Sequence, residues 1–320
     1  MSNSKRALAL SKSQFHEKIR CFFNDNNYVE TQTPILSDTL IPESSIEVFE
    51  TTIIRSDGER QAIFLTPSPE IYMKMLIHEG IGDCYQLTPS FRNCEDQSNR
   101  HANEFTMLEW YSIDRDYHHS IEITQALLRQ LAKLASPESR ACFEHFAVIT
   151  MAQLFNDYVA IDLSTCVSLN DFKKTAERAG FEEYAAKATT WEELFHFIFI
   201  AHVEPMLPKD QSVFVTNYPF QIPTTAKRAE NHYERWELYV NGWEIANCYT
   251  EEARYEQMLT LFENEEKAKQ KMQVPHPVNY EYLNIFKNGT FPHCSGVALG
   301  VDRLFAIAVG ANSIQDIMLV

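Results

Sequence analysis

Two glutamates flank a strong hairpin signal in the segment "WELYVNGWEIANC". Glu237 precedes and Glu244 follows the Asn-Gly pair, the dipeptide most typical of a two-residue turn. Such a turn pairs Glu237 with Ala246 and places both glutamates diagonally on one sheet face. Close carboxylates repel each other unless a cation or a shared proton lies between them, and their hard oxygen atoms suit Mg²⁺ that carries a nucleotide's phosphates. A solvated sheet face with incidental acids is the alternative.

Arginines stand at the ends of two further apolar patterns. Arg92 precedes a polar loop, "NCEDQSNRHAN", which is too long for a tight hairpin and polar enough to close over a ligand. Arg303 stands at the start of an apolar helix predicted after the small residues of "SGVALG", and Gly310 is suited to cap that helix. A guanidinium binds phosphate bidentately, and the positive end of a helix aids it. A structural pair between Arg303 and Asp302 is the alternative.

The segments on either side of the polar loop are predicted to form extended strands. Alternate residues of a strand share one face. The first segment presents Gln86, Thr88, Ser90 and Arg92 together, and the second presents Phe105, Met107, Glu109 and Tyr111.

The rest of the chain indicates a mixed α and β protein. Apolar spacing predicts helices over residues 13–23 and 120–134, a polar helix over 252–272, and strands at "SVFVTNYP" and "RWELYVNGWEIANCYT". Residues 150–210 have a mostly helical pattern, with a capping box predicted from Thr190 to Glu193, and we interpret them as an inserted helical subdomain. Pro34 interrupts the extended segment "YVETQTPIL", since proline cannot donate to a sheet ladder.

Composition and charge disfavour several classes of protein. The 320 residues, 45% of them hydrophobic, are enough for a sizeable buried core. Lys and Arg total 28 against 44 Asp and Glu, a net charge of −16, so the surface repels polyanions and a tRNA or DNA partner is disfavoured. Neither an export signal nor a membrane span is indicated. The seven cysteines lack paired or zinc-like spacing and indicate reduced thiols in a cytoplasmic protein.

Three motifs resemble those of the class II aminoacyl-tRNA synthetases. "YVETQTPIL" is similar to motif 1 with its dimer-interface proline at Pro34, "FRN" with "RHANEFTMLEWY" to motif 2, and "GVALGVDRL" to motif 3. "SPEIYMKML" and "WEIANCYTEE" further resemble the lysyl-tRNA synthetase subgroup. No anticodon-binding barrel precedes motif 1, which makes the chain most similar to the short paralogues that attach β-lysine to a lysine of elongation factor P.

The resemblance implies a fold, an activity and partners. The fold is a class II catalytic core of the α/β (α+β) type, with a mixed, mostly antiparallel sheet flanked by helices. It forms a single domain over residues 1–320 with a helical insertion at 150–210. The activity is activation of lysine or (R)-β-lysine by ATP and Mg²⁺ as an aminoacyl-adenylate, followed by transfer to elongation factor P. A homodimer through the Pro34 motif is implied, with no tRNA and no membrane partner.

Roles for residues at the nucleotide also follow from the resemblance. Forming an adenylate brings a carboxylate against the α-phosphate of ATP, and these anions repel until cations neutralise them. Arg92 is expected to bridge the two anions and Arg303 to hold the γ-phosphate. Glu237 and Glu244 are expected to carry Mg²⁺. The implied ATP site comprises Arg92, Asn93, Cys94, Glu95, His101, Ala102, Asn103, Phe105, Glu244, Ile245, Gly300 and Arg303.

A second set of residues is implied for the amino acid. Burying an ammonium without a partner is costly, so a dibasic substrate needs acids at both ends. The resemblance assigns Glu251 and Tyr111 to the side-chain ammonium, and the "SPE" segment to the other amino group. Singly, each acid has a structural alternative: a helix-start acid, a strand face or a solvated acid pair. The implied set is Ser68, Glu70, Glu109, Tyr111, Asn247, Glu251 and Ala298.

The chain departs from the family pattern at several positions. Cys94 stands where the family has an acid that reads adenine, with Glu95 after it, and "RHANEF" replaces "RHNPEF". Cys248 replaces a glycine, which would cost roughly 1 kcal/mol if the position needs a positive φ. Ala298 also replaces a glycine, and its methyl group is expected to reshape the pocket toward the β-isomer. Two alternatives therefore stay open: a subunit that binds an amino acid without activating it, and an ammonia-dependent ligase of the asparagine synthetase type.

Overall fold

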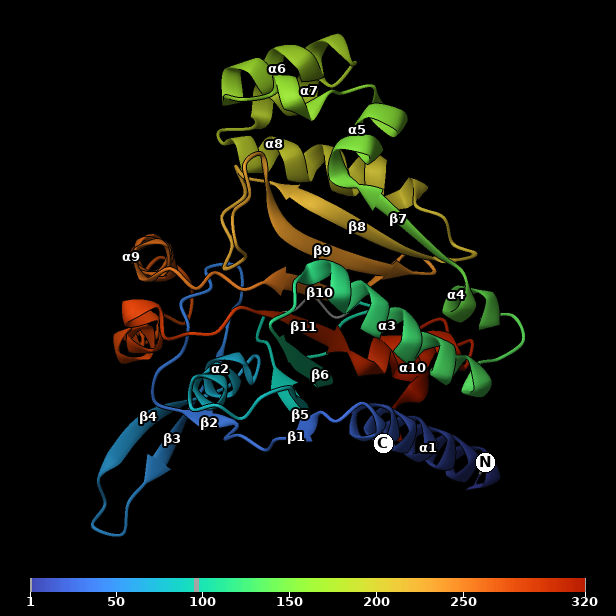
Figure 1. The fold of residues 1–320 in the computed structure, drawn as a ribbon, viewed down its shortest axis with the longest axis vertical. Helices are drawn as coiled ribbons and strands as arrows, with labels where there is room; N and C mark the ends of the chain where they lie inside the picture. Colours follow the sequence, from blue (N-terminus) through green and yellow to red (C-terminus); the bar gives the residue numbers. More distant parts are fainter. Residues whose placement is uncertain (1, 95–97, 320) are drawn as a thin grey trace.

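A computed structural model of the chain describes residues 2–94 and 98–319. Its centre is an eight-stranded sheet in the order β1-β5-β6-β11-β10-β9-β8-β7 (Figure 1). In that order the strands are β1 (Val29–Glu30), β5 (Cys84–Phe91), β6 (Glu104–Ile113), β11 (Cys294–Gly300), β10 (Trp243–Thr250), β9 (His232–Val240), β8 (Ser212–Pro219) and β7 (Phe146–Thr150). Neighbours are antiparallel except for the two edge pairs, β1 with β5 and β7 with β8. The prediction of a mixed, mostly antiparallel sheet is confirmed.

Helices cover one face of this sheet and leave part of the other face open. The covering helices are α1 (Ser2–Asp25), α3 (Tyr117–Leu131) and α10 (Val301–Ala308), and the short α4 (Arg140–Glu144) follows α3. In β6, Leu108 and Trp110 point into the apolar core beneath these helices. Alternate residues must point the other way, and Met107, Glu109 and Tyr111 line a cavity on the open face. Alternate side chains of β6 therefore face the apolar core on one side and the cavity on the other.

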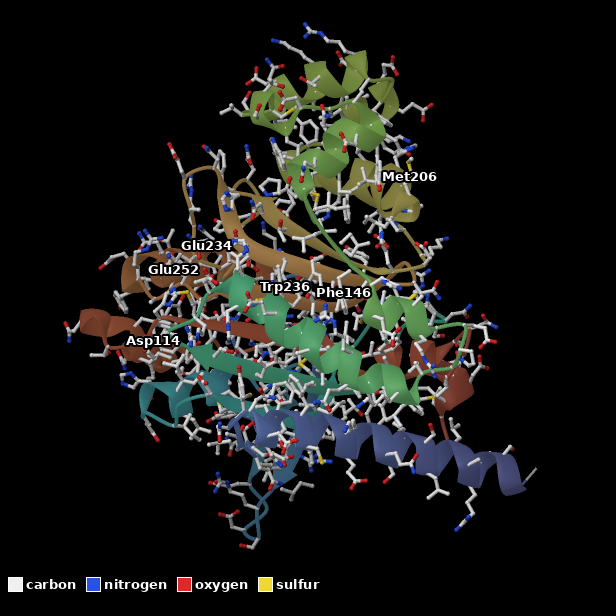
Figure 2. The ribbon with its side chains drawn as sticks, turned by 45° about the vertical axis from the view of Figure 1, so that its right-hand side comes forward. Asp114, Phe146, Met206, Glu234, Trp236 and Glu252 are labelled. Carbon is white, nitrogen blue, oxygen red and sulfur yellow. The ribbon has the colours of Figure 1, made fainter. Side chains whose placement is uncertain are left out.

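Trp236 ties β9 to the covered face. Its indole N–H donates to the Tyr117 carbonyl at 2.7 Å, and its ring packs edge-on against Phe214 (Figure 2). Because successive side chains of a strand point to opposite faces, the neighbours Arg235 and Glu237 are directed to the open face.

A group of helices lies beyond β7 and β8, at the top of Figure 1. It contains α5 (Met151–Val159), α6 (Leu169–Arg178), α7 (Glu182–Lys187) and α8 (Trp191–Ile198). Capping boxes begin α5, α6 and α8, and the one predicted from Thr190 to Glu193 is confirmed. These helices enclose an apolar cluster in which the rings of Phe155 and Phe195 stack at 5.0 Å between centroids.

A smaller sheet and two helices frame the open face. The three-stranded sheet has the order β2-β4-β3, and the helices are α2 and α9. The bounds are β2 (Leu36–Ser37), β3 (Phe49–Ile54), β4 (Arg60–Leu65), α2 (Glu70–His78) and α9 (Tyr255–Lys269). An apolar cluster joins α2 and α9 to Tyr111 of β6 and to a 3-10 segment over 280–289. Side chains from α2 therefore lie beside the end of β6.

In the described part of the chain, no helix has both the length and the apolar character that crossing a membrane requires. The seven cysteines are free thiols.

Candidate active site

The hairpin of β9 and β10 carries the two glutamates, and its register differs from the prediction. Glu244 pairs with Tyr239 as predicted, but Glu237 pairs with Asn247 and not with Ala246. A β-bulge causes this shift, because the consecutive residues Ile245 and Ala246 both join the apolar core. The predicted pairing of Glu237 with Ala246 was wrong.

The bulge has a consequence for the site. Without it, residues three apart such as Glu244 and Asn247 would point to opposite faces of the sheet. With the extra residue both line one cavity, and the strand continues with Tyr249 and Glu251 along a second cavity. One irregularity therefore directs both halves of β10 toward the open face.

Glu237 and Glu244 share that face, as predicted, but their surroundings differ. Glu237 is buried and accepts hydrogen bonds from the guanidinium of Arg235 and from the Tyr239 hydroxyl at 2.7 Å. Glu244 keeps contact with solvent, yet removal from water within the cavity, followed by repulsion from Glu237, raises its pKa to about 7. The site therefore favours a cation near Glu244.

These carboxylates fit a magnesium ion that also binds phosphate. Among the described residues no cluster of three or more His, Cys, Asp or Glu side chains could hold a metal by itself. Mg²⁺ in nucleotide sites is commonly held by one or two carboxylates together with phosphate oxygens and water. Glu244, which lines the first cavity, suits that arrangement, whereas Glu237 lies behind it and is held by Arg235 and Tyr239.

The first cavity, of about 620 Å³, gathers most of the residues expected at ATP. Those that line it are Arg92, His101, Ala102, Phe105, Glu244, Ile245, Gly300 and Arg303. Asn93, Cys94 and Asn103 do not line it, and Glu95 lies outside the described residues. The Asn103 side-chain amide instead donates to the Arg92 carbonyl at 2.9 Å, which closes the base of the polar loop.

Cys94 and Asn93 belong to the outer side of the same loop. Cys94 is exposed with a φ of 54°, and its sulfur lies 3.8 Å from the side-chain oxygen of Gln273. Asn93 donates from its backbone N–H to the Glu47 carbonyl at 2.8 Å. Both line a neighbouring hollow that His101 shares.

Arg92 follows β5 directly and lies where the two cavities meet. Its guanidinium stands 5.5 Å from the centroid of the Phe105 ring. Its buried Nε–H has no hydrogen-bond partner among the described residues. Such buried donors are rare, because an unsatisfied one costs about 1–3 kcal/mol. A negatively charged ligand at the junction would satisfy it.

Arg303 is directed to the first cavity from the start of α10. It donates to the Arg100 carbonyl at 2.8 Å and to the Glu244 carbonyl at 3.0 Å. The alternative pairing partner, Asp302, is held elsewhere, by the Lys12 ammonium at 2.7 Å and the Thr106 N–H at 2.6 Å. Gly310, with a φ of 73°, ends this helix in the conformation that a glycine cap requires.

The second cavity, of about 450 Å³, gathers every residue expected at the amino acid. Ser68, Glu70, Glu109, Tyr111, Asn247, Glu251 and Ala298 all line it. Arg92, Met107, Asn247 and Ala298 line both cavities, so the two are joined. Glu43, which the prediction from sequence did not include, also lines the second cavity, from the segment before β3.

Lys74 is a second residue that the sequence analysis missed. Its buried ammonium lies 2.6 Å from a carboxylate oxygen of Glu70 and 2.6 Å from one of Glu251. Burial alone would lower the pKa of Lys74, but Glu251 and Glu70 raise it well above its usual range. Lys74 therefore stays charged and neutralises part of the acid in the cavity. The four-residue spacing of Glu70 and Lys74 on a helix was the available signal.

Glu109 lies at the centre of a short hydrogen-bond chain. Its two oxygens accept from Ser68 and from the Tyr111 hydroxyl, both at 2.7 Å. Burial, and then the charge of Glu70, raise the pKa of Glu109 to about 8. Glu109 therefore holds its proton more tightly than an ordinary carboxyl group when no cation is bound.

Two small or substituted positions of the sheet have clear roles. At Gly296 an added Cβ would lie 2.4 Å from Glu251 and 2.4 Å from the Tyr111 ring, so this glycine makes room for those side chains. Cys248 has no positive φ and is fully buried on the core face. Its replacement of a glycine therefore carries no backbone strain, and its side chain points away from both cavities.

Comparisons with known proteins agree with this geometry. The model of the class II tRNA synthetases (D, K and N) matches residues 1–320. The elongation factor P–(R)-β-lysine ligase of Pasteurella multocida is 33% identical over 314 residues, covering 97% of this chain and 93% of that protein. The ligases of the same name from Yersinia enterocolitica and Vibrio atlanticus are 32% and 30% identical, over 97% and 94% of this chain.

The fold and the two joined cavities thus define a class II synthetase catalytic core, and the chain belongs to that family. Within it, the chain belongs to the elongation factor P–(R)-β-lysine ligase family and is an enzyme of the ligase class. The predicted family, fold class and enzyme class are confirmed. The alternative of a subunit without catalytic activity is not supported.

Proposed function

We propose that this enzyme uses ATP to activate lysine or (R)-β-lysine as an aminoacyl-adenylate and transfers the acyl group to a lysine side chain of elongation factor P. The names of the relatives and the acidic second cavity support this reaction. The observation that carries it is the position of Arg92, a half-buried arginine at the junction of the two cavities whose buried Nε–H has no partner among the described residues.

The proposed chemistry in the first cavity is mainly electrostatic. The substrate carboxylate attacks the α-phosphate of ATP and displaces pyrophosphate, so two anions must approach each other. At the junction Arg92 would contact both, and Arg303 would hold the γ-phosphate. Bound at Glu237 and Glu244, Mg²⁺ would supply further positive charge to the phosphates. No general base is needed, because the attacking carboxylate is already ionised near neutral pH.

The charges in the second cavity suit a substrate with two ammonium groups. When a cationic substrate keeps Glu43, Glu70 and Glu251 ionised, these three carboxylates oppose the single ammonium of Lys74, Glu109 not counted. Two negative charges remain, and each can pair with one substrate ammonium. The substrate's own carboxylate is left for Arg92.

Ala298 is proposed to favour the β-isomer. It pairs with Glu109 on one side and with Asn247 on the other, and it lines both cavities. Its methyl group therefore occupies space near the reacting end of the substrate. Ala298→Gly should raise the ratio of lysine to (R)-β-lysine turnover by about tenfold, the scale of one methyl group in a pocket. An unchanged ratio in competition assays would contradict this role.

A homodimer in the cytoplasm is part of the proposal. The motif around Pro34 lies beside β1, an edge strand of the large sheet, and Val29, Ile35 and Leu36 are exposed there. Exposed apolar groups on a sheet edge favour pairing with another surface. Sedimentation of the purified chain would test this, with a single 37.1 kDa species as the contradicting result.

Mass spectrometry of the acceptor tests the proposed reaction. Elongation factor P would be incubated with the enzyme, ATP, Mg²⁺ and either lysine or (R)-β-lysine. We expect one lysyl group added to the acceptor, and no addition when ATP is omitted. Identical incubations with ammonia in place of the acceptor would reveal an amide product if the enzyme were of the asparagine synthetase type. An acceptor of unchanged mass in every mixture would overturn the assignment.

A further inference from the structure

The second cavity contains a carboxylate that lies outside the three sequence motifs. Glu43 belongs to the segment between β2 and β3, and it lines the cavity together with Glu70, Glu109 and Glu251. The other three acids come from α2, from β6 and from the residue after β10. Glu43 therefore closes the cavity from a separate side.

The segment that carries Glu43 is fastened to α9. The Ser44 N–H donates to the Glu265 carboxylate at 2.8 Å, and the buried ammonium of Lys269 donates to the Ile46 carbonyl. On the other side, the Leu40 N–H donates to the Pro277 carbonyl at 3.2 Å. Attachments on both sides position the Glu43 side chain.

Glu43 differs from the other acids of the cavity in its partners. Glu70 and Glu251 share Lys74, and Glu109 accepts two hydrogen bonds. Within residues 2–94 and 98–319, the Glu43 carboxylate has no hydrogen bond or ion pair to the protein, although it is half-buried. An acid in this position calls for a cationic partner from the ligand.

Glu43 lines the same cavity as Arg92, the arginine that also lines the nucleotide cavity. Arg92 is among the charged groups that act on Glu43, whereas after burial the pKa of Glu251 is set mainly by Lys74 and Glu70. Burial, and then Glu70, raise the pKa of Glu43 to about 7, while Arg92 and Lys74 oppose this and Glu265 adds to it. The carboxylate is thus poised to ionise when a cation binds.

We propose that Glu43 is a substrate-binding residue that contacts the amino group nearest to the reacting carboxyl group. This inference rests on the proposed function. Arg92 would hold the substrate carboxyl group, and Glu43 beside it would meet the amino group one or two carbons away. Glu251 and Tyr111 would then hold the distal ammonium beyond Lys74.

Calorimetric binding of three ligands to the whole enzyme tests this contact. Lysine and (R)-β-lysine carry both amino groups, whereas 6-aminohexanoate keeps the carboxylate and the distal ammonium but lacks the inner amino group. For Glu43→Gln we expect lysine or (R)-β-lysine to bind about tenfold to a hundredfold more weakly, the range for losing a charge-assisted hydrogen bond. Binding of 6-aminohexanoate should be unchanged.

Matched variants complete the experiment. Glu50→Gln removes the same charge from an exposed position of the adjoining strand β3 and should leave all three affinities unchanged. Glu43→Asp should recover part of the lost affinity, because it restores the carboxylate. Equal binding of lysine to wild type and Glu43→Gln, or equal weakening of all three ligands, would overturn the role of Glu43. Failure of the wild type to bind either lysine isomer would instead overturn the proposed function, and this inference with it.

Discussion

The two joined cavities balance their charges in different ways. In the amino acid cavity, Lys74 already lies between Glu70 and Glu251, so opposite charges are paired within the protein. In the nucleotide cavity, the acid Glu244 has a raised pKa, and the Nε–H of Arg92 has no partner in residues 2–94 and 98–319. The amino acid cavity is therefore organised in part by its own ion pairs, whereas the nucleotide cavity depends on its ligand for charge balance. Substitutions in the two cavities should therefore have different effects.

The largest effect is expected for Lys74→Met, which leaves two buried acids without their cation. Breaking a buried ion pair on one side costs about 3–5 kcal/mol. Urea unfolding should show this loss. Arg20→Met breaks a pair with Glu30 in which both side chains are about 40% exposed, and should cost under about 1 kcal/mol. Equal unfolding midpoints for the two variants would contradict the proposed charge balance.

Arg92→Ala should affect catalysis and leave the fold intact. It removes a buried Nε–H that has no partner in the part of the chain that the structure describes, so the free energy of unfolding should change little. The rate of ATP–pyrophosphate exchange should fall by about 10²–10³, as when an oriented donor to transition-state charge is lost. Arg129→Ala, an exposed arginine of α3 on the covered face, is the control and should keep the full rate. If Arg92→Ala unfolds more easily than the wild type but keeps the full exchange rate, the assignment of Arg92 to catalysis is wrong.

Each cavity has its own glycine, Gly296 in the amino acid cavity and Gly300 in the nucleotide cavity, so each can be narrowed separately. Gly296→Ala would force a methyl group against Glu251 and Tyr111 at 2.4 Å, at a cost of about 1–3 kcal/mol for overpacking. Lysine affinity should therefore fall, while ATP affinity is kept. Gly300→Ala meets its nearest atom at 3.7 Å and should be tolerated structurally. Loss of ATP binding in the Gly296 variant would show that the two cavities are not separable.

The smallest effect is expected in the pH dependence of the nucleotide cavity. The raised pKa of Glu244, about 7, means that its carboxylate is protonated at lower pH and cannot bind a cation. The Mg²⁺ concentration needed to support ATP binding without amino acid should rise about tenfold for each pH unit below 7 and level off above it. Glu244→Gln should need more Mg²⁺ at every pH and lose this dependence. A wild-type profile that is flat from pH 6 to 8 would contradict the role of Glu244.

Local patterns predicted the parts of the site that depend on neighbouring residues. The turn after Val240, the helix start at Arg303 and the alternation along β6 follow from period and turn chemistry. The bulge at Ile245 does not, because two consecutive apolar residues give no sign of which one is extra. The bulge turns the Asn247 side chain to the open face, and this orientation follows from how the strand packs on the core.

Long-range contacts account for most of what the sequence could not supply. Lys74 is four residues from Glu70, but its other partner, Glu251, is 177 residues away. Glu43 reaches the cavity because α9 holds its segment in place. Asn103 was included in the expected ATP site, yet its side-chain amide donates to the Arg92 carbonyl. Contacts between distant parts of the chain thus decide which of the expected residues can contact a ligand.

The central claim is that Arg92 joins two cavities into one site for adenylate formation. Amino-acid-dependent exchange of pyrophosphate into ATP by the wild-type enzyme tests it most directly. We expect exchange with lysine or (R)-β-lysine and none with lysinamide, which keeps both amino groups but lacks the attacking carboxylate. Exchange that is absent with both isomers, in protein that binds ATP and either isomer separately, would contradict the claim.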